Sequence, residues 1–256
     1  MIYTCYEMIR DCREDRAEGW RYFITHYVPV IRRLAAHYAK EDHGLPERVL
    51  QAIRQPQSSL FASLEPAPER WFVAELRQML VAQIDIPTPP VAIGLEELAA
   101  LQPLTLLEKQ AVWMETMGYG PAETGAMLRS SPATVEKVRA RAAELLRAAT
   151  PAWRSTILAD NGLALGRQAA AGRGADCLSA KVFLEVIEGR ATWRGREDLE
   201  RHTGSCWHCI DHFCRMAETV EVLRGLRPLA GGEAAPFQRL LGVEEKRKGW
   251  KAIFGG

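Results

Sequence analysis

The stretch LTLLEKQAVWMETMGYGPAETGAMLRSSPATVEKVRARAAELLRA, residues 104–148, decides the fold of the chain. Its first part repeats apolar residues at helical spacing, namely Leu104, Leu107, Ala111 and Met114. This periodicity ends near Gly118, where Gly-Tyr-Gly-Pro interrupts it. Pro121 suits the first turn of a second, short helix that ends near Leu128. The sequence therefore predicts two helices separated by a glycine-rich turn.

A third helix is predicted to begin at Pro132, with Ser131 as its N-cap. Its apolar side is formed by Val135, Val138, Ala142, Leu145 and Leu146. The outward side combines small residues with Lys137 and Arg141, and Ser131 and Thr134 lie at the helix start, where phosphate oxygens are commonly bound. A short helix, a tight turn and a basic helix form the helix-turn-helix pattern, so we expect these four polar side chains to contact DNA. An amphipathic bundle helix with a solvated face has the same pattern and is the alternative.

Length, charge and hydropathy limit the possible classes of protein. A chain of 256 residues is long enough for two or three small domains. Its 33 Lys and Arg balance 32 Asp and Glu, so any DNA contact must come from a local patch such as residues 129–147. No apolar run approaches the ~20 residues that cross a bilayer, and the N-terminus lacks a signal-peptide core. Strand signals are weak, so we expect an all-α, cytoplasmic protein without a membrane segment.

The N-terminal part, residues 1–86, reads as one helical domain. Helices are predicted at 3–12, 16–38, 47–54 and 70–85. The second of these carries an apolar stripe of Trp20, Phe23, Tyr27, Ile31 and Leu34, which favours a core position over a base-stacking platform. Pro29 predicts a kink or break within it. The proline-rich residues 86–90 read as a linker, and residues 96–100 as a helical turn before the DNA-reading unit at 95–149.

Residues 175–227 contain a cysteine–histidine pattern that predicts a metal site. His202, Cys206 and Cys209 stand at i, i+4 and i+7, so on one helix they share a stripe about 60° wide. Cys177, at the start of a preceding apolar helix, supplies a fourth ligand. Three thiolates and one imidazole form the closed tetrahedral set that holds structural Zn²⁺. The alternative is a group of buried thiols beside a surface histidine, without metal.

The remaining features of this C-terminal part argue against catalysis. Three further side chains, His208, His212 and Cys214, point elsewhere on the helix, although His212 could replace a ligand. Four protein ligands leave no position for an activated water, and no nucleophile–base pair or phosphate loop is evident, so we do not expect an enzyme.

Residues 228–256 read as a glycine- and alanine-rich linker followed by a basic, aromatic tail.

The helix-turn-helix stretch resembles region four of bacterial extracytoplasmic-function (ECF) sigma factors, which reads the −35 promoter element. The matching residues are Leu104, Glu123, Leu128, Ser131, Thr134, Val135, Glu136 and Lys137. Two departures stand out, because Thr124-Gly125 replaces the usual Ile-Ala and Arg139 occupies an aliphatic position. The resemblance implies a DNA-binding protein that acts in transcription initiation.

Residues 1–86 resemble region two of the same family, which binds core RNA polymerase and melts the −10 element. The similarity lies at residues 17–35 and 71–85, whereas the family's middle helix is reduced to residues 46–51. The aromatic and basic residues that face the melted strand in the family have no clear counterpart here. The resemblance implies core RNA polymerase and promoter DNA as partners.

Residues 176–224 resemble the zinc-binding anti-sigma family, small helical domains with an H-x-x-x-C-x-x-C signature that clamp a sigma factor. The chain therefore reads as an ECF-sigma-like initiation factor with a fused zinc module. The resemblance implies that this module regulates its own chain or binds another regulatory protein. A second interpretation is a degenerate sigma/anti-sigma-type adaptor or sequestering factor that does not melt promoters.

Overall fold

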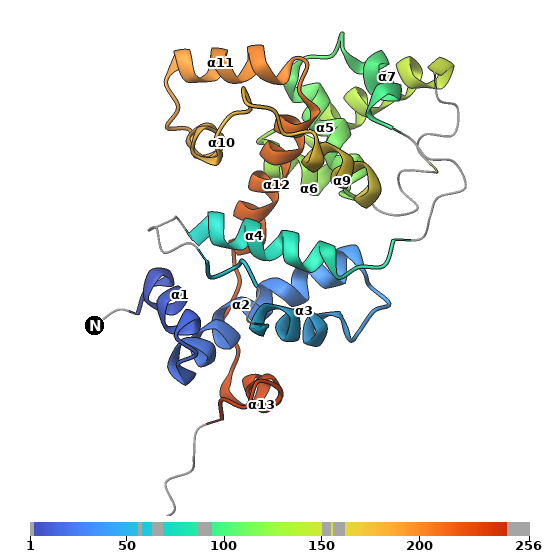
Figure 1. Cartoon of the computed structure of the whole chain (residues 1–256). Coiled ribbons are helices and arrows are strands. Elements are labelled where there is room, and N and C mark those ends of the chain that lie inside the picture. Colours follow the sequence, from blue (N-terminus) through green and yellow to red (C-terminus); the bar gives the residue numbers. More distant parts are fainter. Residues whose placement is uncertain are drawn as a thin grey trace, which may run out of the picture.

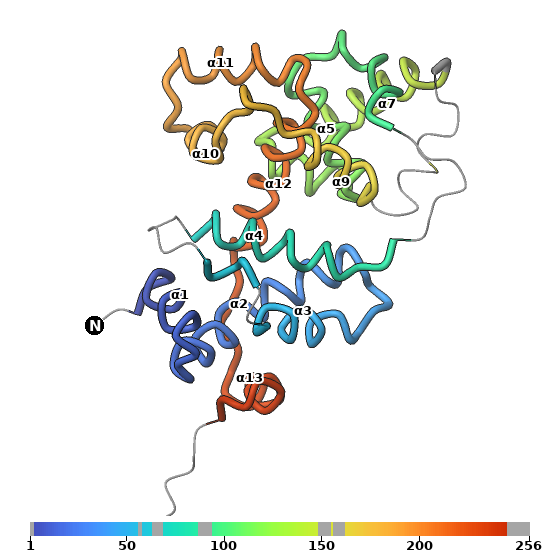
Figure 2. Tube along the Cα trace, in the orientation of Figure 1, coloured from blue at the N-terminus to red at the C-terminus, as the bar shows by residue number. Residues whose placement is uncertain are grey.

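A computed structural model describes residues 3–55, 58–62, 69–86, 94–149, 155 and 162–244. Within these ranges every regular element is helical and no β-strand occurs, which confirms the all-α prediction (Figures 1 and 2). Helix α12, Trp207–Leu223, runs from the upper group of helices in Figure 1 down to the lower group. None of the helices in the described ranges is long and apolar enough to span a bilayer.

The lower group contains the N-terminal helices. These are α1 (Cys5–Arg13), α2 (Ala17–Tyr38), α3 (Leu45–Arg54) and α4 (Glu69–Ala82). The aromatic stripe of α2 is core, because Trp20, Phe23 and Tyr27 are at most 2% exposed. Helix α2 continues through Pro29 without the predicted break. Burial of the neighbouring Val28 and Val30 offsets the roughly 3 kcal/mol that an internal proline costs a helix.

The C-terminal segment predicted as a glycine- and alanine-rich linker followed by a tail contains a helix. Helix α13, Gly231–Leu240, lies in the lower group beside α2. It buries Ala234 and Phe237, and Arg32 of α2 lies over the Phe237 ring at 4.9 Å. Apolar residues at i, i+3 and i+7 supply the buried face that the glycine and alanine content concealed. From residue 245 onward, the predicted basic, aromatic tail lies outside the described residues, as does the predicted proline linker from residue 87 onward.

The three helices predicted within residues 104–148, which we call the helix-turn-helix, are present. After the 3₁₀ helix η1 (Leu95–Leu101) come α5 (Leu106–Thr116), α6 (Pro121–Leu128) and α7 (Pro132–Ala149). Ser131 caps α7, because its Oγ accepts a hydrogen bond from the Thr134 amide at 3.1 Å. Gly125 permits the close turn between α6 and α7, since a Cβ there would lie 2.6 Å from the carbonyl oxygen of Ser130.

The two departures from the region-four pattern contact each other. Arg139 of α7 is 6% exposed and donates to Thr124 Oγ1 at 2.7 Å and to the Tyr119 carbonyl at 2.9 Å. A buried guanidinium is costly unless its donors are satisfied. The threonine and the arginine therefore form a buried polar pair inside the helix-turn-helix core.

Two hydrophobic cores divide the chain differently from the predicted domains. The first joins α1 to α4 with α13 and the end of α12. The second, which forms the upper group of helices, joins the helix-turn-helix with α9 (Leu163–Ala171), α10 (Ala180–Ile187), α11 (Trp193–Thr203) and most of α12. The residues predicted as separate units at 95–149 and 175–227 thus share one core.

Candidate metal centre

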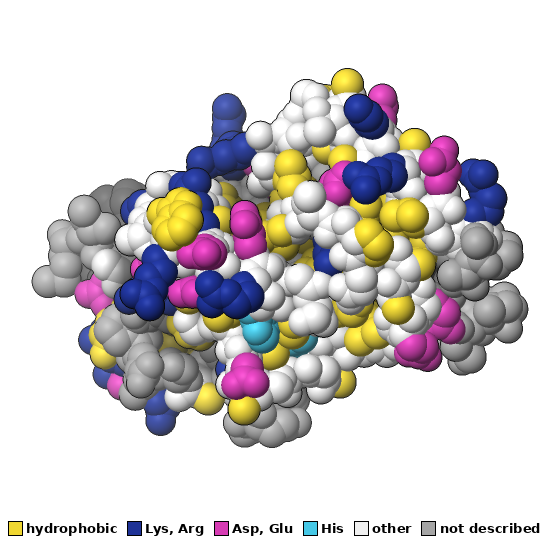
Figure 3. All heavy atoms as spheres, turned by 90° about the horizontal axis from the view of Figure 1, so that it is seen from above, with side chains coloured by type: hydrophobic (Ala, Val, Ile, Leu, Met, Phe, Trp, Pro, Cys, Tyr) yellow, Lys and Arg dark blue, Asp and Glu magenta, His cyan; other side chains and the backbone are white. Residues whose placement is uncertain are grey.

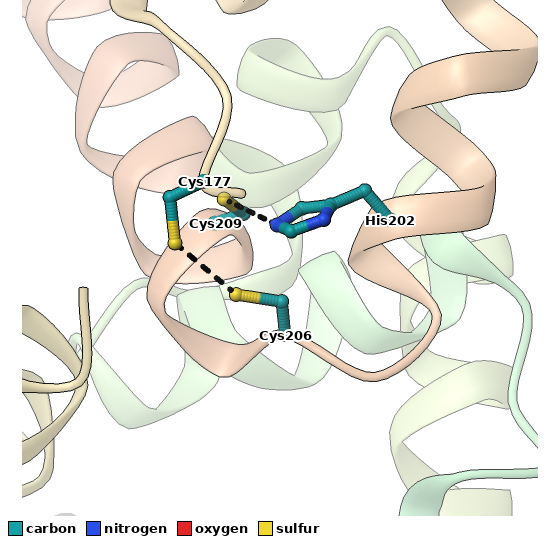
Figure 4. Close-up of side chains that lie close together, drawn as sticks. All are labelled: Cys177, His202, Cys206 and Cys209. Atoms are coloured by element: carbon teal, nitrogen blue, oxygen red, sulfur yellow. Dashed lines mark hydrogen bonds between the residues drawn. The ribbon is translucent and has the colours of Figure 1, made fainter. Parts of the chain in front are cut away.

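Four predicted ligands converge in the upper group of helices. The side chains of Cys177, His202, Cys206 and Cys209 point toward one another (Figure 4), and their ligand atoms all lie within 4.8 Å of one another. Cys177 Sγ is 3.8 Å from Cys206 Sγ, and His202 Nε2 is 3.1 Å from Cys209 Sγ. These four side chains form a group that can hold one metal ion.

The ligands come from three segments rather than from a single helical face. His202 lies in the last turn of α11, the chain turns at Gly204 and Ser205, and Cys206 is the N-cap residue of α12. Cys177 lies in the loop before α10 instead of starting that helix. Seven positions of a straight helix extend about 10 Å along its axis, so ligands at i and i+7 reach one ion only if the helix is interrupted. The predicted residues are brought together, but by a different local geometry.

The donor set fits a tetrahedral zinc ion. With Zn–S bonds of about 2.3 Å, tetrahedral angles place two sulfurs about 3.8 Å apart, as observed for Cys177 and Cys206. Burial raises the pKa of Cys206 and raises that of Cys209 to about 12, so in the absence of a cation these thiols stay protonated. A bound divalent cation reverses this preference, because the ligating form of cysteine is the thiolate.

The helix-turn-helix supports the corner that carries two of the ligands. Lys109 of α5 donates from Nζ to the Gly204 carbonyl at 2.6 Å. At the first residue of α12, the Trp207 ring stacks on Trp113 of α5 with centroids 5.5 Å apart. Since a buried ammonium and an indole pair hold this corner, the position of His202 relative to Cys206 depends on α5.

The three other candidates near the ligands have other contacts. His208 bonds through Nδ1 with the Ala169 carbonyl at 2.9 Å, and the Cys214 thiol donates to the Gln110 carbonyl at 3.8 Å. His212 packs against Phe183 with centroids 5.0 Å apart, and burial lowers its pKa to about 4. None of the three belongs to the four-residue group, so His212 does not replace a ligand in this arrangement.

The residues predicted to contact DNA are all exposed, Ser131 just before α7 and the other three on it, while Val135, Val138 and Ala142 on the other side of the helix are buried. Ser131 is engaged as the helix cap, and Arg141 forms an ion pair with Glu108 of α5 at 2.8 Å. Lys137 is exposed. Figure 3 shows that, on the face seen from above, basic side chains are interspersed with acidic and apolar ones. Any DNA contact on α7 therefore depends on a few residues rather than on a broad basic surface.

Sequence reasoning missed a buried polar cluster around Glu218 of α12. Its carboxylate accepts hydrogen bonds from Tyr38 of α2, Arg77 of α4 and Tyr119 of the α5–α6 turn. Arg77 also donates to the Tyr38 hydroxyl at 2.6 Å. Burial holds the pKa of both tyrosines far above the ordinary value, so both hydroxyls remain donors. Glu218 falls four residues after buried Cys214, a spacing that could have indicated a buried acid.

A second contact joins the lower group directly to the helix-turn-helix. The His37 ring of α2 stacks on Tyr119 at 4.0 Å with an interplanar angle of 7°, and His37 Nε2 lies 2.7 Å from the Met117 carbonyl oxygen. Together with Glu218, this contact fixes the helix-turn-helix against the N-terminal helices.

Comparisons with protein-family models, with curated proteins and with solved structures give no match for this chain. We therefore infer the function from the residues of the chain and their geometry.

Proposed function

We propose that the chain is an ECF-sigma-like transcription initiation factor that binds core RNA polymerase and reads promoter DNA through α7. The observation that carries this proposal is the helix-turn-helix, whose third helix buries its apolar side and exposes Ser131, Thr134, Lys137 and Arg141. Small and basic residues on an exposed helix face are the type that enters a major groove.

We further propose that Cys177, His202, Cys206 and Cys209 bind one structural Zn²⁺. The support is the Cys₃His donor set and the sulfur spacing given above. Four protein ligands complete the tetrahedron, so the ion stabilises the fold of its surroundings and does not activate water. The proposed site contributes to function through the position of α12.

The zinc module is proposed to regulate the chain in cis by fixing its two sigma-like units. Helix α12 contacts the α2, α4 and helix-turn-helix residues through Glu218, whereas the outward face of α7 stays exposed. Regulation would thus act on the placement of the two units and not by covering the DNA-reading face. The alternative function for the whole chain is an adaptor or sequestering factor of sigma/anti-sigma type, which is supported by the shortened middle helix of the N-terminal unit. The alternative for the zinc module alone is a passive, zinc-stabilised appendage without a regulatory role.

Core RNA polymerase distinguishes the two functions. An initiation factor co-purifies with the core enzyme and supports run-off transcription from a cognate promoter. An adaptor binds a protein partner without giving a transcript. Failure both to bind the core enzyme and to give a transcript, tested with the full chain and with α12 released by a Glu218 variant, would contradict the initiation-factor proposal.

The double substitution Lys137→Ala/Arg141→Ala is expected to weaken promoter binding and to flatten its salt dependence. The binding constant falls as salt rises, and each lost phosphate contact makes the slope of log K against log salt concentration shallower by about one. The measurement is a fluorescence-anisotropy titration at several salt concentrations. Lys181→Ala is the control, because Lys181 is an exposed lysine on α10 whose ion pair is with Glu185 of its own helix. An unchanged slope in the double variant would remove α7 as the DNA-reading helix.

A further inference from the structure

A cavity of about 190 Å³ lies where α4, α5, α9 and α12 meet, apart from the metal centre. Its walls combine the apolar Val81, Trp113 and Leu163 with the charged Arg77, Asp211 and Arg215. Exposed Ala82 and Arg167 belong to the same lining, so the cavity opens to solvent between α4 and α9. A cavity of about 150 Å³ holds one benzene molecule, so this one has room for a ring and a small polar substituent.

The polar groups of the cavity leave one donor unused. Asp211 accepts a hydrogen bond from Trp113 Nε1 at 3.1 Å and pairs with Arg215 at 2.5 Å. The Arg215 side chain is only 11% exposed, and its Nε has no hydrogen-bond partner in the described part of the chain. Buried N–H groups are almost always paired in folded proteins. An acceptor that enters the cavity would satisfy this one.

The charge around the cavity favours an anion. Three guanidinium groups line it, those of Arg77, Arg167 and Arg215. Two carboxylates oppose them, because Asp211 pairs with Arg215 and Glu218 pairs with Arg77. Among the three guanidinium groups, the positive charge of Arg167 is left without an opposing carboxylate in this count. An inorganic anion would satisfy the charge but leave the apolar walls without contacts, whereas an organic anion satisfies both.

We propose that this cavity is a binding site for a small amphipathic organic anion, one ring or a short chain that carries a single carboxylate. The carboxylate accepts from Arg215 Nε, and the apolar part packs against Trp113 and Val81. Since α4 belongs to the N-terminal helices, α5 to the helix-turn-helix and α12 to residues 175–227, which we call the metal-binding segment, a bound ligand strengthens the contact among the three. The site does not depend on the proposed role in transcription, because its occupancy can be measured without DNA or polymerase.

The test uses the full-length metal-loaded protein and three probes of similar size, benzoate, benzyl alcohol and benzylamine, with inorganic phosphate as a fourth. Calorimetric titration and thermal unfolding report binding. Benzoate is expected to bind and to raise the unfolding midpoint, with an affinity at least about tenfold above that of the neutral and cationic probes, since a charged hydrogen bond is worth that factor or more.

Two substitutions locate the site. Ala170→Leu places a larger side chain at a lining position and is expected to abolish benzoate binding, whereas Ala171→Leu, at the exposed neighbouring residue outside the lining, is expected to preserve it. Arg215→Gln is expected to lower benzoate affinity at least about tenfold. If Arg215→Gln does not fold, the result for Ala170→Leu tests the proposal in its place. The proposal is overturned if the wild type binds none of the probes, if benzyl alcohol or phosphate binds as well as benzoate, or if Ala170→Leu binds like the wild type.

Discussion

Cys206→Ser is expected to lose the metal and, with it, the folded state of the whole upper group of helices. Structural zinc contributes on the order of 10 kcal/mol to folding, which is comparable with the total stability of a typical domain, about 5–15 kcal/mol. The helix-turn-helix unfolds along with the metal-binding segment, because both share one core and Lys109 and Trp113 contact the ligand-bearing corner. Metal analysis together with thermal unfolding followed by circular dichroism measures both effects.

Cys5→Ser is the matched control for the loss of one thiol. Cys5 lies half-buried in α1, in the lower group of helices and outside the four-residue metal group. We expect this variant to keep its metal and its unfolding midpoint. A Cys206→Ser protein that loses the metal but keeps a cooperatively folded helix-turn-helix would show that the two units are independent, contrary to the shared core.

Glu218→Gln is expected to lower the free energy of unfolding by about 3–5 kcal/mol, because the change leaves a buried guanidinium without its counter-charge. Arg77 and Glu218 are 6% and 0% exposed at their side chains, so water cannot replace the lost partner. The same substitution weakens the hydrogen bonds that join α12 to α2, α4 and the α5–α6 turn. In the described part of the chain, Glu218 is the acidic residue of α12 that bonds to all three. Urea unfolding measures the stability, and small-angle X-ray scattering measures any separation of the two groups of helices.

Glu221→Gln provides the comparison on the same helix. Glu221 lies near the end of α12 and pairs with Arg224, whose side chain is 63% exposed. Exposed pairs contribute at most about 1 kcal/mol, so this variant should unfold nearly like the wild type. Equal effects of the two substitutions would mean that the Glu218 cluster does not fix the helices more than a surface ion pair does.

The helix-turn-helix could be predicted from sequence because its signals are local. Gly118 and Pro121 mark one boundary, and the Ser131 cap with Pro132 marks the next. The apolar spacing of Val135, Val138 and Ala142 identified the buried side of α7 as the structure has it. Such boundaries depend on backbone preferences within a few residues, which a sequence displays directly.

The members of the four-residue group could also be predicted, but their geometry could not. Residue type and spacing selected Cys177, His202, Cys206 and Cys209, and the structure brings all four together. The pattern predicted one continuous helix through three of them, whereas the chain turns between His202 and Cys206. Glycine is a poor helix former that nevertheless occurs inside helices, so Gly204-Ser205 did not by itself place the turn.

The contacts between distant segments could not be predicted from the sequence. Glu218 meets residues that precede it by 99 to 180 positions, and no periodicity encodes such pairs. For the same reason the common core of the helix-turn-helix and the metal-binding segment was predicted as two units. Helix α13 was not predicted, because two glycines and a proline (Gly231, Gly232 and Pro236) indicated a linker more strongly than the apolar spacing of Ala234 and Phe237 indicated a helix.

The central claim is that a metal ion held by three cysteines and one histidine fixes α12 between the two groups of helices. Metal analysis of the purified full-length chain, combined with X-ray absorption at the zinc edge, tests it most directly. The account predicts one zinc per chain, with three sulfur ligands at about 2.3 Å and one nitrogen ligand at about 2.0 Å. Protein that folds without metal, or zinc bound by oxygen ligands in place of the three thiolates, would contradict it.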